Sequence, residues 1–188
     1  ITFDGVKPLS FLSIDGAKEV GVEIHSLSKA FNMTGWRLAF IAGNPDVINI
    51  YGTVKANSDS GQFRAIQKSG VYALNHPEIT TRNCEKYSRR FDLLIAALRE
   101  VGFDVEKPKA TFYSYVPIPK GTKSGKIFEN AEDFSLYLLN NAFICTVPWN
   151  TPEPYVRLSI TFEAKDFEEE KRIINELKQR LLKLELVF

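Results

Sequence analysis

The first third of the chain alternates short apolar blocks with polar connections. Residues 20–24 alternate apolar with small or polar side chains, and residues 38–42 form an unbroken apolar block. Apolar blocks of this length, bounded by glycine, asparagine and proline, favour strands over helices. We therefore expect two short strands, joined by a polar connection over residues 25–37.

Helical signals begin after position 43. Asn44 followed by a proline is a helix-start signal, and it predicts a short helix at this point. The polar segment 55–63 is expected to be a loop that leads into a second helix, with Asp59 or Ser60 as its cap.

A long helix is expected from Thr80 or Thr81 to a stop at Gly102. One face of this segment carries an apolar stripe with helical spacing, formed by Tyr87, Phe91, Leu94, Ile95, Leu98 and Val101. A role in packing is sufficient to explain this helix.

The last part of the chain mixes strand-like and helical segments. The strand-like segments are 103–105, 110–117, 142–147 and 154–161. Helix starts are expected at 130–133 and near Asp166, where acidic residues in the first turn complement the helix dipole.

Composition narrows the class of protein. The chain has 188 residues and is 44% hydrophobic, which is enough for one ordinary domain or two small ones. Its 24 basic and 23 acidic residues give a net charge of +1 and hence no electrostatic case for nucleic acid or a membrane surface. No apolar run reaches the ~18–20 residues of a spanning helix. Cys84 and Cys145 lack metal-type spacing, so we expect reduced thiols, no metal and a cytoplasmic protein.

The polar connection carries the candidate chemistry. Lys29 follows two hydroxyl residues, Ser26 and Ser28, and Arg37 lies eight positions later. A lysine amine forms a Schiff base with an aldehyde. The two hydroxyls and a guanidinium are donors suited to phosphate oxygens. This arrangement is what a covalently held, phosphate-bearing aldehyde cofactor requires.

The pattern S-x-S-K-x-F-x-x-x-G-x-R over residues 26–37 resembles the cofactor-lysine motif of class I/II pyridoxal-phosphate aminotransferases. The resemblance implies an α/β chain of the fold-type I aminotransferase fold. It also implies that Lys29 is catalytic and that Ser26, Ser28, Lys29 and Arg37 bind pyridoxal 5'-phosphate. The expected activity is transfer of an amino group between an amino acid and a 2-oxo acid.

A second arginine fits the same resemblance. In the expected strand 154–161, Val156 and its alternate neighbours share one face, and Arg157 points to the other. The aminotransferase family has an arginine in a Y-x-R-x-S strand that pairs bidentately with the substrate α-carboxylate. By resemblance, Arg157 is the substrate-binding residue, because its planar fork suits a carboxylate.

The run D-S-G-Q-F at 59–63 resembles a segment of aminotransferases related to LL-diaminopimelate aminotransferase. It makes LL-diaminopimelate and 2-oxoglutarate the leading substrate pair. In the family this loop approaches the active site of a neighbouring subunit, so a homodimer is expected. Asn57 and Ser60 receive no role here, since a capped helix start explains them equally well.

The resemblance also implies a domain organisation. Residues 1–80 are expected to be the C-terminal part of the cofactor-binding large domain, and residues 81–188 the small C-terminal domain. The family aspartate that pairs with the cofactor ring nitrogen has no convincing counterpart in this chain. We therefore expect the chain to be the C-terminal half of an aminotransferase, incomplete when alone.

Two alternatives remain open on the sequence. One is a different pyridoxal-phosphate reaction on the same scaffold, such as that of a β-lyase or a synthase, because Arg157 is compatible with both. The other is an inactive C-terminal fragment that catalyses nothing by itself.

Overall fold

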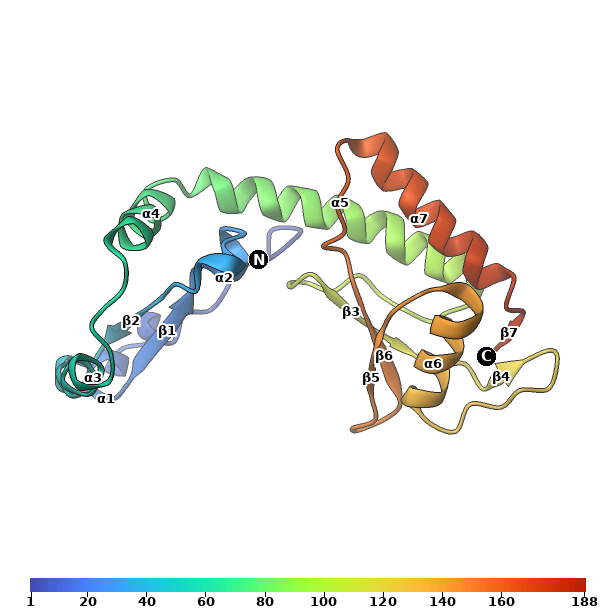
Figure 1. The fold of residues 1–188 in the computed structure, drawn as a ribbon, viewed down its shortest axis with the longest axis horizontal. Helices are drawn as coiled ribbons and strands as arrows, with labels where there is room; N and C mark the ends of the chain where they lie inside the picture. The colour runs from blue at the N-terminus through green and yellow to red at the C-terminus, as the bar shows by residue number, and fades with distance from the viewer. The chain divides into compact units, whose positions relative to one another are not determined.

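The structure is a computed structural model that describes residues 1–188. The chain forms two compact units, Ile1–Glu85 and Lys86–Phe188. Their division falls inside the long helix α5 (Glu78–Val101), close to the boundary expected at residue 80. Each unit has its own sheet and is described separately (Figure 1).

The N-terminal unit is built on a two-stranded antiparallel sheet. Its strands are β1 (Val22–Ser26) and β2 (Ala39–Gly43), which confirms the two expected strands. The register pairs Val22 with Gly43 at one end and Ser26 with Ala39 at the other. The polar connection therefore begins and ends at the same end of the sheet.

Six short or medium helical segments complete this unit. They are η1 (Phe11–Ser13), α1 (Ala17–Val20), α2 (Leu27–Ala30), η2 (Thr34–Trp36), α3 (Pro45–Ser58) and α4 (Arg64–Leu74). The expected start of α3 is confirmed, because the Asn44 side chain accepts hydrogen bonds from the next two available backbone N–H groups.

Two expectations about α3 and α4 are wrong. Helix α3 is 14 residues long rather than short, and it runs through the first four residues of the expected loop. Side chains of Asn57 and Ser58 bond to carbonyls four residues earlier, so polar residues continue the helix. Asp59 does not cap α4, since its carboxylate accepts from Lys55 and the Gly61 backbone; α4 has no side-chain cap.

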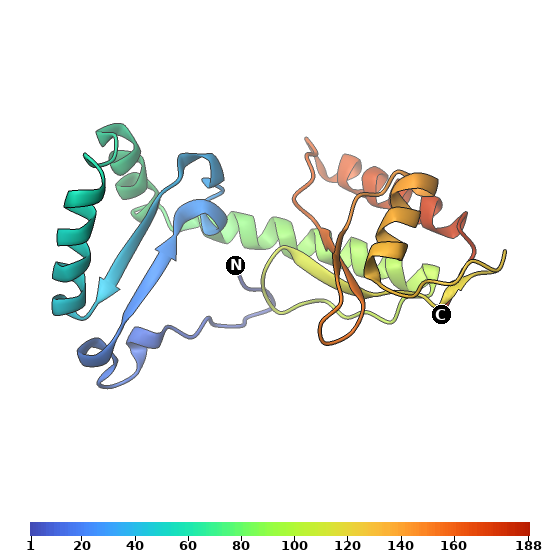
Figure 2. The ribbon, with the colours of Figure 1, turned by 60° about the horizontal axis from the view of Figure 1, so that its bottom comes forward.

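The C-terminal unit, whose chain runs from green to red in Figure 2, contains a three-stranded antiparallel sheet with the order β3-β6-β5. Its strands are β3 (Tyr113–Pro117), β5 (Val147–Trp149) and β6 (Tyr155–Ser159), so β6 is central. A second, two-stranded sheet pairs β4 (Gly121–Thr122) with β7 (Leu186–Val187).

Helices α6 (Ala131–Ala142) and α7 (Phe167–Leu182) join the second part of α5 in this unit. The expected caps are confirmed: Asn130 accepts from the Asp133 N–H, and Asp166 accepts from the Glu169 N–H. The largest fully buried side chains are Phe91, Leu94, Leu98, Val116, Pro119, Phe134, Leu138, Val156 and Ile160.

Two expected strands are absent from the C-terminal unit. Residues 103–105 form no strand, because the Phe103 N–H bonds back to Leu98 and closes α5. The segment 142–147 is mostly the end of α6 and a loop. Phe143 adopts left-handed backbone angles, and the N–H groups at 143 and 144 bond to carbonyls of the last helical turn.

Candidate active site

The connection between β1 and β2 holds the predicted cofactor residues together. Ser26 ends β1 and pairs with Ala39, and the Leu27 N–H donates to the Leu38 carbonyl at 3.1 Å. The chain therefore returns to its starting point after eleven residues, and it brings the Arg37 backbone close to Ser26. Four of the five predicted site residues lie on this connection.

Apolar side chains anchor the connection on helix α4. Leu27, Met33 and Leu38 are buried with Ala73 in one cluster, and Ile66 packs against them. These anchors are interleaved with the candidate polar residues along the sequence. Packing of these residues holds the backbone of the connection in place. Ser26, Lys29 and Arg37 are exposed, whereas Ser28 is buried.

Local hydrogen bonds fix the polar residues further. The Ser26 hydroxyl oxygen accepts from the Ser28 N–H at 3.2 Å and caps α2. The Thr34 hydroxyl donates to the Ser28 carbonyl at 3.0 Å, and Arg37 Nη1 donates to the Thr34 carbonyl at 2.8 Å. Thr34 therefore links Ser28 to Arg37, a role that sequence patterns did not reveal because it depends on the loop closing.

Arg37 has an unusual backbone conformation for a non-glycine residue. Its φ and ψ angles are 51° and 49°, in the left-handed region. The Gln62 amide approaches the Arg37 carbonyl at 3.4 Å and supports this turn. Backbone strain of this kind persists where surrounding contacts hold it, often beside a functional group.

The donors on this connection fit a phosphate-bearing aldehyde such as pyridoxal phosphate. The Ser26 hydroxyl acts as an acceptor toward the backbone, so its own O–H remains a donor. Arg37 is exposed and uses one nitrogen on Thr34, which leaves further N–H donors of its fork for phosphate oxygens. Lys29 supplies a primary amine on α2, one residue after Ser28.

Arg157, the fifth predicted residue, lies in the C-terminal unit on the central strand β6. It pairs with Tyr115 of β3 on one side and Val147 of β5 on the other. Its guanidinium carbon lies 4.2 Å from the centroid of the Tyr113 ring. No carboxylate of the chain forms an ion pair with Arg157, so its charge is available to an external anion.

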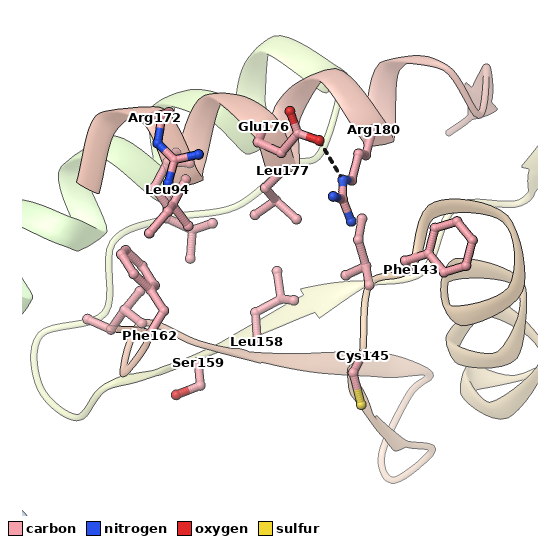
Figure 3. A pocket seen from close by; sticks show the side chains of 14 residues that line it. Leu94, Phe143, Cys145, Leu158, Ser159, Phe162, Arg172, Glu176, Leu177 and Arg180 are labelled. Carbon is pink, nitrogen blue, oxygen red and sulfur yellow. Dashed lines mark hydrogen bonds and ion pairs between the residues drawn. The ribbon is translucent and has the colours of Figure 1, made fainter. Parts of the chain in front are cut away.

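An apolar pocket of about 460 Å³ lies elsewhere in the C-terminal unit, between α7, β6 and the segment after α6 (Figure 3). Leu158 and Leu177 face each other across it, and the Glu176–Arg180 ion pair of 2.8 Å lies at its edge. The hydrogen bond from Arg180 holds the pKa of the Glu176 carboxyl below its ordinary value. None of the predicted site residues lines this pocket, whose walls come from segments distant in sequence.

A second hollow, of about 540 Å³, borders the connection between β1 and β2. Phe31, Met33 and Trp36 form one side of it, and Lys68 and Tyr72 of α4 form the other. It lies on the side of the connection that faces α4, and three of its nine lining residues are aromatic.

Comparisons with known proteins point to one family. The family model for class I and II aminotransferases matches residues 7–174. LL-diaminopimelate aminotransferase of Methanococcus maripaludis is 53% identical over 189 residues, covering 98% of this chain and 45% of the relative. The enzyme of the same name from Methanocaldococcus jannaschii is also 53% identical, over 100% of this chain and 46% of its own length.

The fold gives the same result. The aspartate aminotransferase structure from Rhizobium meliloti superimposes with a TM-score of 0.84 at 27% identity, over 99% of this chain and 48% of that one. The chain thus spans about half the length of the relatives that it matches. No helix in the structure combines the length and apolarity needed to cross a membrane. With nine-tenths of its residues inside the family model and an aminotransferase fold, the chain belongs to the class I and II aminotransferases.

Proposed function

We propose that the full-length gene product carrying this chain transfers an amino group between an amino acid and a 2-oxo acid, using pyridoxal 5'-phosphate. The observation that carries the proposal is the β1–β2 connection, which holds Ser26, Ser28, Lys29 and Arg37 in a chain that belongs to the aminotransferases. When bound, the cofactor supplies an electron sink that makes removal of a substrate Cα proton feasible.

The residues of this chain divide the remaining work. Ser26, Ser28 and Arg37 bind the phosphate through hydroxyl and guanidinium donors and thereby anchor the cofactor. Lys29 would hold the cofactor through its amine, and that amine would move the proton at the substrate Cα. Arg157 binds the substrate α-carboxylate bidentately and orients the Cα–H bond.

LL-diaminopimelate is the proposed amino donor, with 2-oxoglutarate as acceptor. Support comes from the two relatives named LL-diaminopimelate aminotransferase, each 53% identical to this chain. Both proposed substrates carry an α-carboxylate, so one arginine serves the two half-reactions. We further propose a cytoplasmic homodimer, in which residues 1–80 belong to the cofactor-binding domain and residues 81–188 to the small domain.

The decisive experiment replaces Lys29 in the full-length gene product. With wild-type protein and pyridoxal phosphate, we expect borohydride reduction followed by peptide mapping to place the cofactor covalently on Lys29. Lys29→Ala should lose that label and reduce amino transfer from LL-diaminopimelate to 2-oxoglutarate to background. Lys18→Ala removes another lysine from the same unit and should change neither result.

Three outcomes would contradict the proposal. Undiminished amino transfer by Lys29→Ala removes the catalytic role of this lysine. Repeated turnover without any 2-oxoglutarate, with keto acid and free ammonia released well beyond one equivalent per cofactor, would indicate a lyase instead of a transaminase. A full-length wild-type protein that traps no cofactor would contradict the proposed role of Lys29 in holding it.

A further inference from the structure

Arg157 lies on a face of the β3-β6-β5 sheet that is rich in aromatic rings. Tyr113 and Tyr115 of β3 pair with Ser159 and Arg157 of β6, and directly paired residues share a face of an antiparallel sheet. Trp149 of β5 lies on the same face, with its ring 6.1 Å from that of Tyr115 in an edge arrangement. Arg157 thus shares its face of the sheet with several rings, and its two paired neighbours, Tyr115 and Val147, carry no acid.

One of these rings contacts the guanidinium directly. The Arg157 carbon Cζ lies 4.2 Å from the Tyr113 ring centroid, which is the distance of a cation–π contact. A flexible arginine side chain stacked on a ring has fewer orientations available. It also keeps its N–H donors in the guanidinium plane, free for a carboxylate.

Tyr113 is itself held by the core of the unit. Its ring lies 4.6 Å from that of Phe112, and Phe112 lies 5.8 Å from Tyr87 of α5. Tyr87 and Phe112 are both buried, with 4% and 8% of their surface exposed. A continuous stack of tilted rings, Tyr87–Phe112–Tyr113, therefore leads from a buried helix residue to the charged group on β6.

The backbone just before this stack is strained. Thr111 has a φ angle of 80°, in a region that β-branched residues rarely adopt. Such a conformation persists only where neighbouring structure imposes it. Here it sets the direction in which Phe112 and Tyr113 leave the turn and enter β3.

We propose that Tyr113 is a positioning residue that holds the Arg157 guanidinium in place for a substrate carboxylate, as the last ring of the Tyr87–Phe112–Tyr113 stack. This inference rests on the proposed function, because it assigns to Arg157 the carboxylate of the amino-acid substrate. It predicts that the aromatic face of residue 113 matters, while its hydroxyl group does not.

The test measures carboxylate binding and turnover separately, with the full-length gene product and bound cofactor. Glutarate, a dicarboxylate without an amino group, is titrated by calorimetry, and KM and kcat are measured for LL-diaminopimelate. We expect Tyr113→Leu to raise the glutarate Kd and the KM about three- to tenfold, with a smaller change in kcat. Tyr113→Phe should behave as wild type. Tyr137→Leu is the matched control, since this half-buried tyrosine of the same unit packs on Phe128 and not on a cation.

A fluorinated ring separates positioning from folding. Pentafluorophenylalanine at position 113 keeps the shape of the ring and removes the negative charge on its face, so it should weaken glutarate binding even if Tyr113→Leu fails to fold. Unchanged Kd and KM in the fluorinated protein would overturn the inference, as would a wild-type protein that binds no glutarate.

The inference and the proposed function can fail separately. A wild-type protein that binds glutarate, loses that binding on fluorination and transfers no amino group would contradict the proposed function while supporting the role of Tyr113. A protein that transfers amino groups normally with either change at position 113 would leave the function intact and remove the positioning role.

Discussion

Glu170 is a buried charged residue of the C-terminal unit. Its carboxylate is 4% exposed and accepts hydrogen bonds from Arg89 at 2.9 and 3.0 Å and from Arg90 at 2.8 Å. Arg90 also donates to the carbonyls of Ile160 and Phe162, just beyond β6. The cluster therefore ties α5 and α7 to the end of the strand that carries Arg157.

Glu170→Gln should destabilise the protein by about 3 kcal/mol, because it leaves the buried Arg90 charge without its counter-ion. The measurement is urea unfolding at pH 7, compared with Glu168→Gln, which alters an exposed pair on the same helix. A loss for Glu170→Gln no larger than for the control would contradict a stabilising role for the cluster.

Because of Glu170, we also expect the stability of the protein to depend on pH. Burial raises the pKa of Glu170, but the hydrogen bonds from Arg89 and Arg90 outweigh burial, and the pKa lies below its ordinary value of 4.5. The unfolded chain therefore binds this proton at higher pH than the folded one. The stabilisation is complete above about pH 4.5 and is lost as the pH falls through the folded-state value.

Thermal unfolding between pH 6 and pH 3 tests this dependence. We expect the wild-type melting temperature to fall more steeply with acid than that of Glu170→Gln, which has no proton to gain at this position. Parallel curves for the two proteins would show that the acid sensitivity arises elsewhere.

Among the elements, helix α4 packs directly against the connection between β1 and β2. Gly70 of α4 faces Leu38, and a methyl group added at Gly70 would lie 2.5 Å from Leu38 Cδ2. Leu38 is buried and is the immediate neighbour of Arg37. Close packing between α4 and the connection therefore constrains the backbone next to Arg37, the residue proposed to bind phosphate.

Gly70→Ala is expected to weaken pyridoxal phosphate binding in the full-length protein, because Leu38 must move and Arg37 moves with it. Overpacking costs about 1–3 kcal/mol, against a gain of up to about 1 kcal/mol in helix propensity. Gly52→Ala is the matched control, since Gly52 lies in α3 with nothing within 4 Å of the added methyl. Equal cofactor affinities for the two variants, measured by absorbance titration, would contradict this link.

Sequence patterns predict the elements that depend on local signals. The caps at Asn130 and Asp166 and the strand blocks of β1, β2 and β6 follow from nearby residues, and the structure confirms them. The length of α3 and the end of α6 do not follow from such patterns. In α3, polar side chains extend the helix by donating hydrogen bonds to backbone carbonyls. After α6, the backbone N–H groups of Phe143 and Ile144 end the helix by bonding to carbonyls of its last turn. No rule based on composition specifies these bonds.

At the scale of the whole molecule, helices of the two units differ in how many apolar side chains they bury. Helix α3 has no buried residue, whereas Phe91, Leu94 and Leu98 of α5 are almost fully enclosed in the C-terminal unit. Free energies of local opening follow the number of buried apolar contacts. Stability within this chain should therefore be uneven.

Hydrogen exchange of the 188-residue chain tests this unevenness. We expect the amides of α3 to exchange at low opening free energies and those of residues 91–98 to exchange only through global unfolding of their unit. Equal protection of the two helices would mean that α3 is stabilised by contacts absent from the structure.

By itself, the sequence determined the order of chemical groups along the chain. Ser26, Ser28, Lys29 and Arg37 lie within one short segment, and short-range spacing survives any fold that keeps the segment together. The alternation of apolar and polar residues around Arg157 is likewise a property of neighbouring positions in the sequence. For these residues the candidate chemistry follows from residue type and spacing alone.

Only the tertiary structure decided what holds these groups. Thr34 bridges Ser28 and Arg37, α4 packs under the connection, and Tyr113 stacks on Arg157. The last contact joins residues on two different strands, and Glu170 meets Arg90 across 80 positions. Such contacts arise when strands pair and helices pack, and side-chain spacing along the chain carries no information about them.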